Sequence, residues 1–184
     1  MNAHDKKILA QLAQSPGEFI GRLKIVDEKG QERMFNTPFA EQVMALEDFC
    51  SDAETVIHYK PRQIGDTTVA TAYNFNYLYW TQDPARSLVV ADSYDSTDAI
   101  FGRVRHYYRS LPQMLKKPIE RSNKRELIFK DSMAGFRCMT AGGKSDARGW
   151  TYQRLHADEL AFWPNAEDVW ASVTSTLHEG PHKK

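Results

Sequence analysis

The chain has 184 residues, which is enough for one domain and short for two. Hydrophobic residues make up 41% and aromatic residues 11%, so the composition can supply a core and excludes a disordered chain. Twenty-four basic residues balance twenty-four acidic ones, which removes the large positive net charge typical of many nucleic-acid-binding proteins. Since no long apolar run or signal-peptide core is present, we expect a soluble protein without a membrane span.

The first 50 residues predict a helix, a hairpin and a second helix. Residues 1–22 form a polar helical segment with a turn at 15–17. Residues 22–35 alternate apolar and polar side chains around Lys29-Gly30, which is typical of a β-hairpin. Residues 37–50 carry apolar side chains at helical spacing, with Thr37 as the expected N-cap.

The rest of the chain predicts alternating strands and helices. Strands are expected at 54–60, 86–93 and 153–162, helices at 67–82, 96–112 and 165–179, and a second hairpin at 125–141. Strands that alternate with helices indicate βαβ units. The expected fold class is therefore α/β, with a mainly parallel sheet and flanking helices.

The segment between the strand at 54–60 and the following helix is similar to a phosphate-binding loop. Such a loop has the pattern G-x-x-x-x-G-K-[ST] between a strand and a helix. The candidate nucleotide-binding residues are Lys60, Pro61, Arg62, Gln63, Ile64, Gly65, Asp66, Thr67 and Thr68. Backbone N–H groups of the loop and of the first helical turn would face the phosphates, and Thr67 occupies the position of a Mg²⁺-binding hydroxyl.

The position that usually holds the loop lysine is occupied by Asp66. We expect Lys60, at the first loop position, to supply the missing cation, with Arg62 as a second one. Asp66 would then point to solvent or to a basic partner. The alternative is a plain strand-to-helix turn, in which Gly65 provides a positive φ and Asp66 is favoured near the helix N-terminus.

Three further positions have residue types that suit the same chemistry. Asp158 and Glu159 end an apolar strand, where the aspartate can hold Mg²⁺ and the glutamate can orient and deprotonate a water molecule. Arg148 can stabilise charge on a γ-phosphate. Gln42 can read an adenine edge, because its amide both donates and accepts. The alternatives are an acidic pair at a helix start, a surface arginine and a solvated glutamine.

Together, the loop at 60–68, residues 87–112 and residues 146–173 resemble the ATPase domain of the large terminase subunit of tailed bacteriophages. The resemblance runs from about residue 35 to residue 178. It implies a P-loop NTPase fold of the Rossmann-like, additional-strand ATPase type. The expected organisation is a helix and hairpin at 1–34, an ATPase domain at 35–179 and a tail at 180–184.

The resemblance also implies a role for each candidate residue. Gln42 matches the family's adenine contact, and Thr67 and Asp158 match its Mg²⁺ ligands. The catalytic residues would be Glu159, the loop arginine Arg62, and Arg148 as an arginine supplied to a neighbouring subunit. Lys60 matches a variant loop in which the lysine stands first. ATP and Mg²⁺ are the implied cofactors, and an Mg²⁺-dependent ATPase is the implied activity.

The implied biological role is a motor that drives viral DNA into the procapsid. The implied partners are double-stranded viral DNA, the portal protein, the small terminase subunit and further copies in a homo-oligomeric ring, in the cytoplasm of a bacterial host and without a membrane. We expect no nuclease activity, since the family's nuclease domain follows the matched region. The alternative function is a catalytically weak or inactive terminase-like fragment that serves as an assembly or interaction module.

Overall fold

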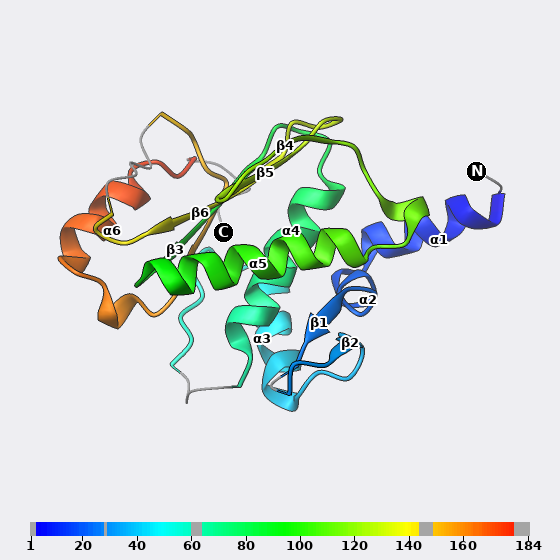
Figure 1. Ribbon diagram of the computed structural model, residues 1–184, viewed down its shortest axis with the longest axis horizontal. Helices are drawn as coiled ribbons and strands as arrows, with labels where there is room; N and C mark the ends of the chain where they lie inside the picture. Colours follow the sequence, from blue (N-terminus) through cyan, green and yellow to red (C-terminus); the bar gives the residue numbers. More distant parts are fainter. Residues whose placement is uncertain (1–2, 28, 60–63, 144–148, 179–184) are drawn as a thin grey trace.

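The computed structural model describes residues 3–27, 29–59, 64–143 and 149–178 (Figure 1). Its α-helices are α1 (Ala3–Gln14), α2 (Pro16–Ile20), α3 (Ala40–Cys50), α4 (Asp66–Trp80), α5 (Tyr94–Ser110) and α6 (Ala166–Thr174). Its strands are β1 (Lys24–Val26), β2 (Glu32–Met34), β3 (Arg86–Ala91), β4 (Ile119–Ser122), β5 (Glu126–Phe129), β6 (Gly135–Thr140) and β7 (Arg154–Ala157). Two 3₁₀ turns are η1 (Gln113–Leu115) and η2 (Leu160–Phe162).

The main sheet is mixed, so the expected α/β class is confirmed and the expected mainly parallel sheet is wrong. Its strand order is β4-β5-β6-β3-β7. β3 pairs in parallel with both β6 and β7, whereas β5 pairs antiparallel with β4 and β6. The short turn between β5 and β6 can join only antiparallel strands. The predicted hairpin at 125–141 therefore adds an antiparallel half to the sheet, which β4 extends.

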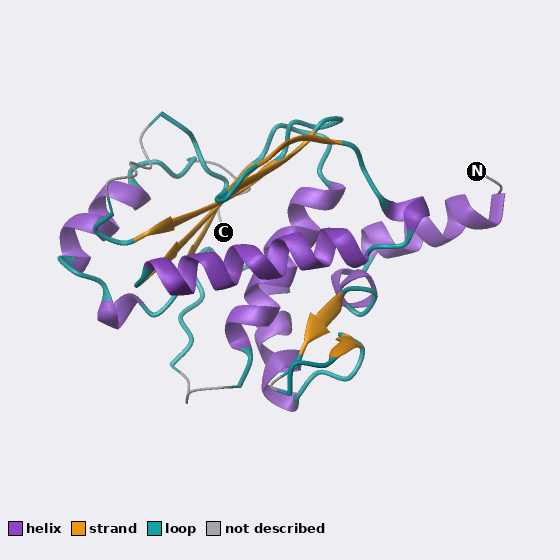
Figure 2. Ribbon diagram, in the orientation of Figure 1, coloured by secondary structure: helices purple, strands orange, loops and turns teal. Residues whose placement is uncertain are grey.

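The two faces of the sheet are covered by different helices (Figure 2). Along β3, Val89 and Ala91 lie in the core formed with α4 and α5, while Leu88 and Val90 pack in the smaller core that includes residues of α6. Successive side chains of a strand point to opposite faces, and here both faces are buried. This explains why residues 88–91 are a continuous apolar run.

Aromatic side chains connect the N-terminal segment to the sheet. The ring centroids of Phe19 in α2 and Tyr79 in α4 are 4.8 Å apart, and those of Tyr79 and Phe129 in β5 are 5.8 Å apart. Burial of the Tyr79 phenol raises its pKa to about 12. These contacts place α2 in the same core as the sheet.

Several local predictions are confirmed and others are wrong. The hairpins at 22–35 and 125–141 and the helix at 67–82 are confirmed. α3 begins after Phe39, so the expected Thr37 N-cap is wrong, and the Thr37 hydroxyl instead accepts a hydrogen bond from Arg33. Residues 54–59 form no strand, so that part of the predicted strand at 54–60 is also wrong. Its β-branched side chains favour a strand only where they can pack against a neighbour, and Ile57 is exposed.

None of the helices in the described ranges has the length and apolar character needed to cross a membrane.

We predict that Phe75→Ala will lower the free energy of unfolding by about 3–5 kcal/mol, because the fully buried ring contacts other rings of the core. Phe162→Ala is the matched control, since that ring is 61% exposed and its loss should change stability by less than about 0.5 kcal/mol. Urea denaturation of both variants measures the difference. Equal losses in the two variants would contradict the core described above.

Candidate functional site

The candidate site lies where the carboxyl ends of β3 and β7 meet the N-terminus of α4. Val90 in β3 is opposite Ala157 in β7, and Asp158 follows directly. Ligands of open α/β sheets commonly bind outside the carboxyl ends of parallel strands. The first turn of α4 faces the same region, and a helix N-terminus has backbone N–H groups without partners inside the helix.

A hydrogen bond joins two of the predicted metal ligands. The Thr67 hydroxyl donates to Asp158 Oδ1 at 2.8 Å, although the residues are 91 positions apart in sequence. Asp158 is buried, and its backbone is fixed on both sides: its N–H donates to Val90 at 2.8 Å and its carbonyl accepts from the Trp163 indole at 2.8 Å. A hydroxyl and a carboxylate are thus held together in one position.

This donor pair suits Mg²⁺. Mg²⁺ prefers oxygen ligands and is usually held by one or two protein groups, with phosphates and water completing its shell. In the described ranges, no group of three or more His, Cys, Asp or Glu side chains forms a metal cage. The Thr67–Asp158 pair supplies two oxygen donors, which matches the number of protein groups that usually hold Mg²⁺ beside a phosphate.

Glu159 is placed by an unusual backbone conformation. Its φ of 53° and ψ of 41° lie in the left-handed region, which is uncommon for residues other than glycine. The chain turns sharply there, directly after β7, and η2 begins. As a result Asp158 is buried while Glu159, the next residue, is exposed. A carboxylate in this position is accessible to water.

Gly65 and Gln42 connect α3 to the start of α4. Gly65 has a φ of 77°, and a Cβ at this residue would lie 2.1 Å from Gln42 Nε2. Gln42 is only 4% exposed; its Oε1 accepts from the Phe39 N–H at 3.0 Å, and its Nε2 donates to the Gly65 carbonyl at 3.4 Å. Gln42 is therefore not the solvated helix glutamine of the alternative interpretation.

Asp66 does not point to solvent. It is buried, and its Oδ1 lies 2.8 Å from His58 Nδ1. The expectation of a solvent-facing carboxylate is wrong, and the basic partner is a histidine of the segment that precedes the loop.

Two further contacts fix the first turns of α4. The Tyr107 hydroxyl donates to the Thr68 carbonyl at 3.2 Å, and the Thr71 hydroxyl donates to the Thr67 carbonyl at 2.6 Å. Burial raises the pKa of Tyr107 well above its usual value, so the phenol stays a neutral donor. Thr67 therefore sits on a rigid helix start.

The predicted cations cannot be placed in this site. Lys60, Pro61, Arg62, Gln63 and Arg148 lie outside the described residues. Within the described ranges, the ion pairs of Asp66 and Asp158 are to histidines, His58 and His156 respectively.

Two residues that position the site were not predicted from the sequence. His58 contacts Asp66, and the Trp163 indole holds the carbonyl of Asp158. Trp163 lies five residues after Asp158, and this short sequence separation could have suggested the contact. No sequence pattern indicates the contact of His58 with Asp66, because it depends on the tertiary fold.

A known protein family matches the part of the chain that contains most of these residues. Residues 57–180, a span of 124 of the 184 residues, match the family described as terminase large subunit, T4likevirus-type, N-terminal. The chain belongs to this family. The match includes the loop, β3, β7 and the acidic pair, whereas Gln42 precedes the matched range.

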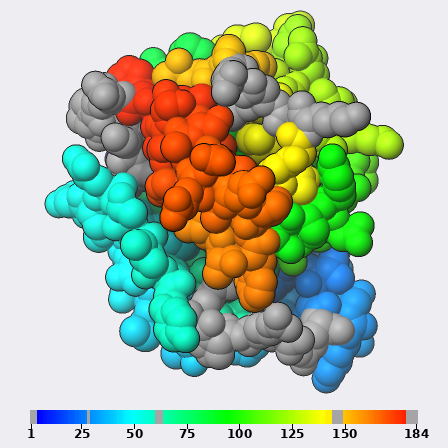
Figure 3. Space-filling view, turned by 90° about the vertical axis from the view of Figure 1, so that its left-hand side faces the viewer, coloured from blue at the N-terminus to red at the C-terminus, as the bar shows by residue number. Residues whose placement is uncertain are grey.

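One face of the molecule is formed by segments that are distant in sequence. Figure 3 shows residues of the β7–α6 region, in orange, between the cyan surface of α3 and the segment after it and the green surface of α5. This face of the molecule is therefore formed by segments from the middle and the end of the chain.

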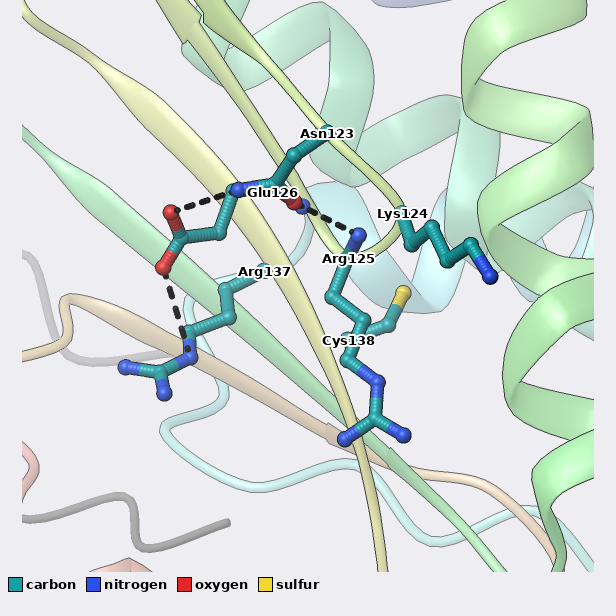
Figure 4. A pocket seen from close by; sticks show the side chains of 6 residues that line it. All are labelled: Asn123, Lys124, Arg125, Glu126, Arg137 and Cys138. Carbon is teal, nitrogen blue, oxygen red and sulfur yellow. Dashed lines mark hydrogen bonds and ion pairs between the residues drawn. The ribbon is translucent and has the colours of Figure 1, made fainter.

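A separate hollow on the sheet has side chains that largely satisfy one another (Figure 4). Glu126 forms ion pairs with Arg121 and Arg137, and the Asn123 side chain accepts from the N–H of Glu126. Burial raises the pKa of the Cys138 thiol well above its usual value, which keeps it protonated and unreactive. The geometry assigns no chemistry to this hollow.

We predict that Gly65→Ala will destabilise the protein by about 1 kcal/mol or more beyond the effect of Gly30→Ala. Both glycines have a positive φ, 77° at Gly65 and 75° at Gly30, but of the two only a Cβ at Gly65 would meet a neighbouring side chain. Thermal or urea unfolding of both variants checks this. Equal destabilisation would mean that Gln42 is not held against Gly65 in solution.

Proposed function

We propose that the chain is the ATP-binding and ATP-hydrolysing motor domain of a phage terminase large subunit, which powers packaging of viral DNA into the procapsid. The observation that supports this most strongly is the 2.8 Å hydrogen bond between Thr67 Oγ1 and Asp158 Oδ1. A Mg²⁺–nucleotide site of the P-loop type needs these two groups, a hydroxyl at a helix start and a carboxylate at a strand end, close together. The additional-strand P-loop ATPase fold belongs to the same proposal.

Binding of the triphosphate would depend on the start of α4. Its unpaired N–H groups and the positive end of its dipole favour an anion. In the proposal Lys60 and Arg62 add the cationic charge, and Gln42 contacts adenine. The Gln42 amide retains one donor and one acceptor site beyond its bonds to Phe39 and Gly65.

Hydrolysis would depend on the acidic pair. Thr67 and Asp158 would hold Mg²⁺, which supplies charge neutralisation to the phosphates. Glu159, exposed beside the buried Asp158, would orient the attacking water and accept its proton. Arg148 would stabilise the γ-phosphate of a neighbouring subunit's nucleotide.

The partners and location follow from the proposed motor role. They are double-stranded viral DNA, the portal protein, the small terminase subunit and further copies of the chain in a ring, within the cytoplasm of the bacterial host.

A second candidate, an inactive assembly or interaction module of the same family, is favoured by the buried carboxylate of Asp66 at the usual lysine position. Its charge at the start of α4 opposes binding of a phosphate. The two candidates differ in whether the folded chain binds ATP with Mg²⁺.

We predict that Glu159→Gln will lower the ATPase rate about 100-fold or more while ATP affinity stays within about twofold, because the amide cannot accept the proton. Glu167→Gln is the matched control, since Glu167 is exposed in the first turn of α6 and should leave the rate unchanged. Phosphate release and calorimetric binding measure the two effects. An unchanged rate in Glu159→Gln would remove Glu159 from the mechanism.

We predict micromolar binding of ATP with Mg²⁺, equivalent to about −8 kcal/mol, by the wild-type chain. Lys60→Ala should weaken it roughly tenfold or more through loss of a charge-assisted contact, whereas Lys29→Ala, in the exposed turn of the first hairpin, should not. Isothermal titration calorimetry gives both values. No binding by a well-folded wild-type chain would favour the interaction module and reject the motor.

A further inference from the structure

We propose that a cavity between the first hairpin and α5 binds a small amphipathic anion, which is an apolar or aromatic group that carries a phosphate or a carboxylate. The cavity has a volume of about 410 Å³, and small-molecule sites typically have volumes of about 300–1,000 Å³. A ligand there is additional to the nucleotide of the proposed function and does not depend on it.

One wall of the cavity is apolar. Figure 1 shows the hairpin of β1 and β2 beside α5, and β1 contributes Ile25 and Val26 to the lining. Ile25 is buried, whereas Val26 is 57% exposed, so this wall is partly open to solvent. An apolar wall of this kind suits the hydrocarbon part of a ligand.

The opposite wall, formed by α5, is hollowed by small residues. Ala99 and Gly102 line the cavity at positions where longer side chains would fill it. Apart from the backbone of the helix itself, a Cβ at Gly102 would have no neighbouring atom within 4 Å. Glycine in the middle of a helix lowers stability, and here no close neighbour requires it. The space beside Gly102 is therefore available to a ligand.

Arg103, on the same wall, gives the cavity a preference for anions. In the described part of the chain it forms no ion pair with a carboxylate. Its guanidinium is always charged, and its planar set of donors matches the oxygens of a phosphate or a carboxylate.

His106 adds a second polar group to this wall. Its Nε2 is buried and, among the described residues, has no hydrogen-bond partner, since Glu32 Oε1 is 3.6 Å away. A ligand oxygen would accept a hydrogen bond from this nitrogen in the tautomer that is protonated there. Glu32 is held by Lys24 Nζ at 2.6 Å, so its charge is already balanced.

The cavity and the proposed metal site lie on different sides of the start of α4. The Thr67 hydroxyl donates to Asp158 at the end of β7, whereas the carbonyl of Thr68 accepts from Tyr107 of α5. Thr68 and Tyr107 line the cavity, and Asp158 does not. An anion in the cavity is therefore separate from a cation on Asp158.

NMR titration of the isotope-labelled chain tests the proposal. The probe is naphthyl phosphate, whose rings suit the apolar wall and whose phosphate suits Arg103. It is added without Mg²⁺ or nucleotide, so that the proposed nucleotide site lacks its metal. We expect saturable shifts of the backbone amides of Ile25, Gly102 and His106, with a Kd of roughly 0.1–1 mM for a ligand of this size.

Two related compounds define the chemistry of the ligand. Naphthol has the same rings without the anionic group, and it should bind at least about tenfold more weakly because it cannot form an ion pair with Arg103. Naphthoate carries a carboxylate on the same rings and shows which of the two acidic groups the cavity prefers.

Variants of α5 then locate the site. Arg103→Ala should weaken binding of naphthyl phosphate about tenfold or more. Arg109→Ala is the matched control, because Arg109 is exposed in the last turn of the same helix and should change the Kd by less than about twofold. Gly102→Leu fills the space and should abolish the shifts without loss of stability, since leucine is favoured over glycine in a helix.

Three results would overturn the proposal: equal Kd values for naphthyl phosphate and naphthol, equal effects of Arg103→Ala and Arg109→Ala, or amide shifts confined to residues outside the lining. None of them affects the proposed nucleotide site, which is tested with ATP and Mg²⁺. If Gly102→Leu does not fold, the comparison of the two arginine variants decides the question alone.

Discussion

The hydrogen bond between Thr67 Oγ1 and Asp158 Oδ1 joins the start of α4 to the end of β7. Other contacts hold the two elements that this bond joins. α4 is held by Tyr107 through the Thr68 carbonyl, and β7 is held in register by its parallel pairing with β3. Because both elements are anchored by the core, the hydroxyl and the carboxylate meet without depending on the loop between them.

Much of this arrangement could be predicted because its signals are local. The apolar run of β3, the long helix from Thr67 and the acidic pair after β7 each follow from a pattern within a few residues. Membership of the terminase large-subunit family agrees with these patterns over residues 57–180. The order of the chemical groups along the chain could thus be predicted from the sequence, whereas the distances between these groups in the fold could not.

The failures share a cause, which is dependence on tertiary neighbours. The mixed sheet arises because the second hairpin pairs its strand β6 with β3, and no local pattern specifies that partner. Residues 54–59 have β-forming side chains, but none of the strands in the described part of the chain pairs with them. The N-cap of α3 is Phe39 and not Thr37. The buried side-chain oxygen of Gln42 accepts a hydrogen bond from the Phe39 backbone N–H. The pairing of Asp66 with His58 likewise depends on how the chain folds back before α4.

Charge is the remaining constraint on the site, since three carboxylates lie close to the place proposed for a triphosphate: Asp66, Asp158 and Glu159. In the proposed function, Asp158 would hold a divalent cation and Glu159 would accept a proton, while Asp66 contacts His58. The most direct test is a crystal structure with Mg²⁺ and a non-hydrolysable ATP analogue. The account predicts a cation about 2.1 Å from Thr67 Oγ1, with Asp158 bound to it directly or through water. A triphosphate bound elsewhere, with the Thr67–Asp158 hydrogen bond intact, would contradict it.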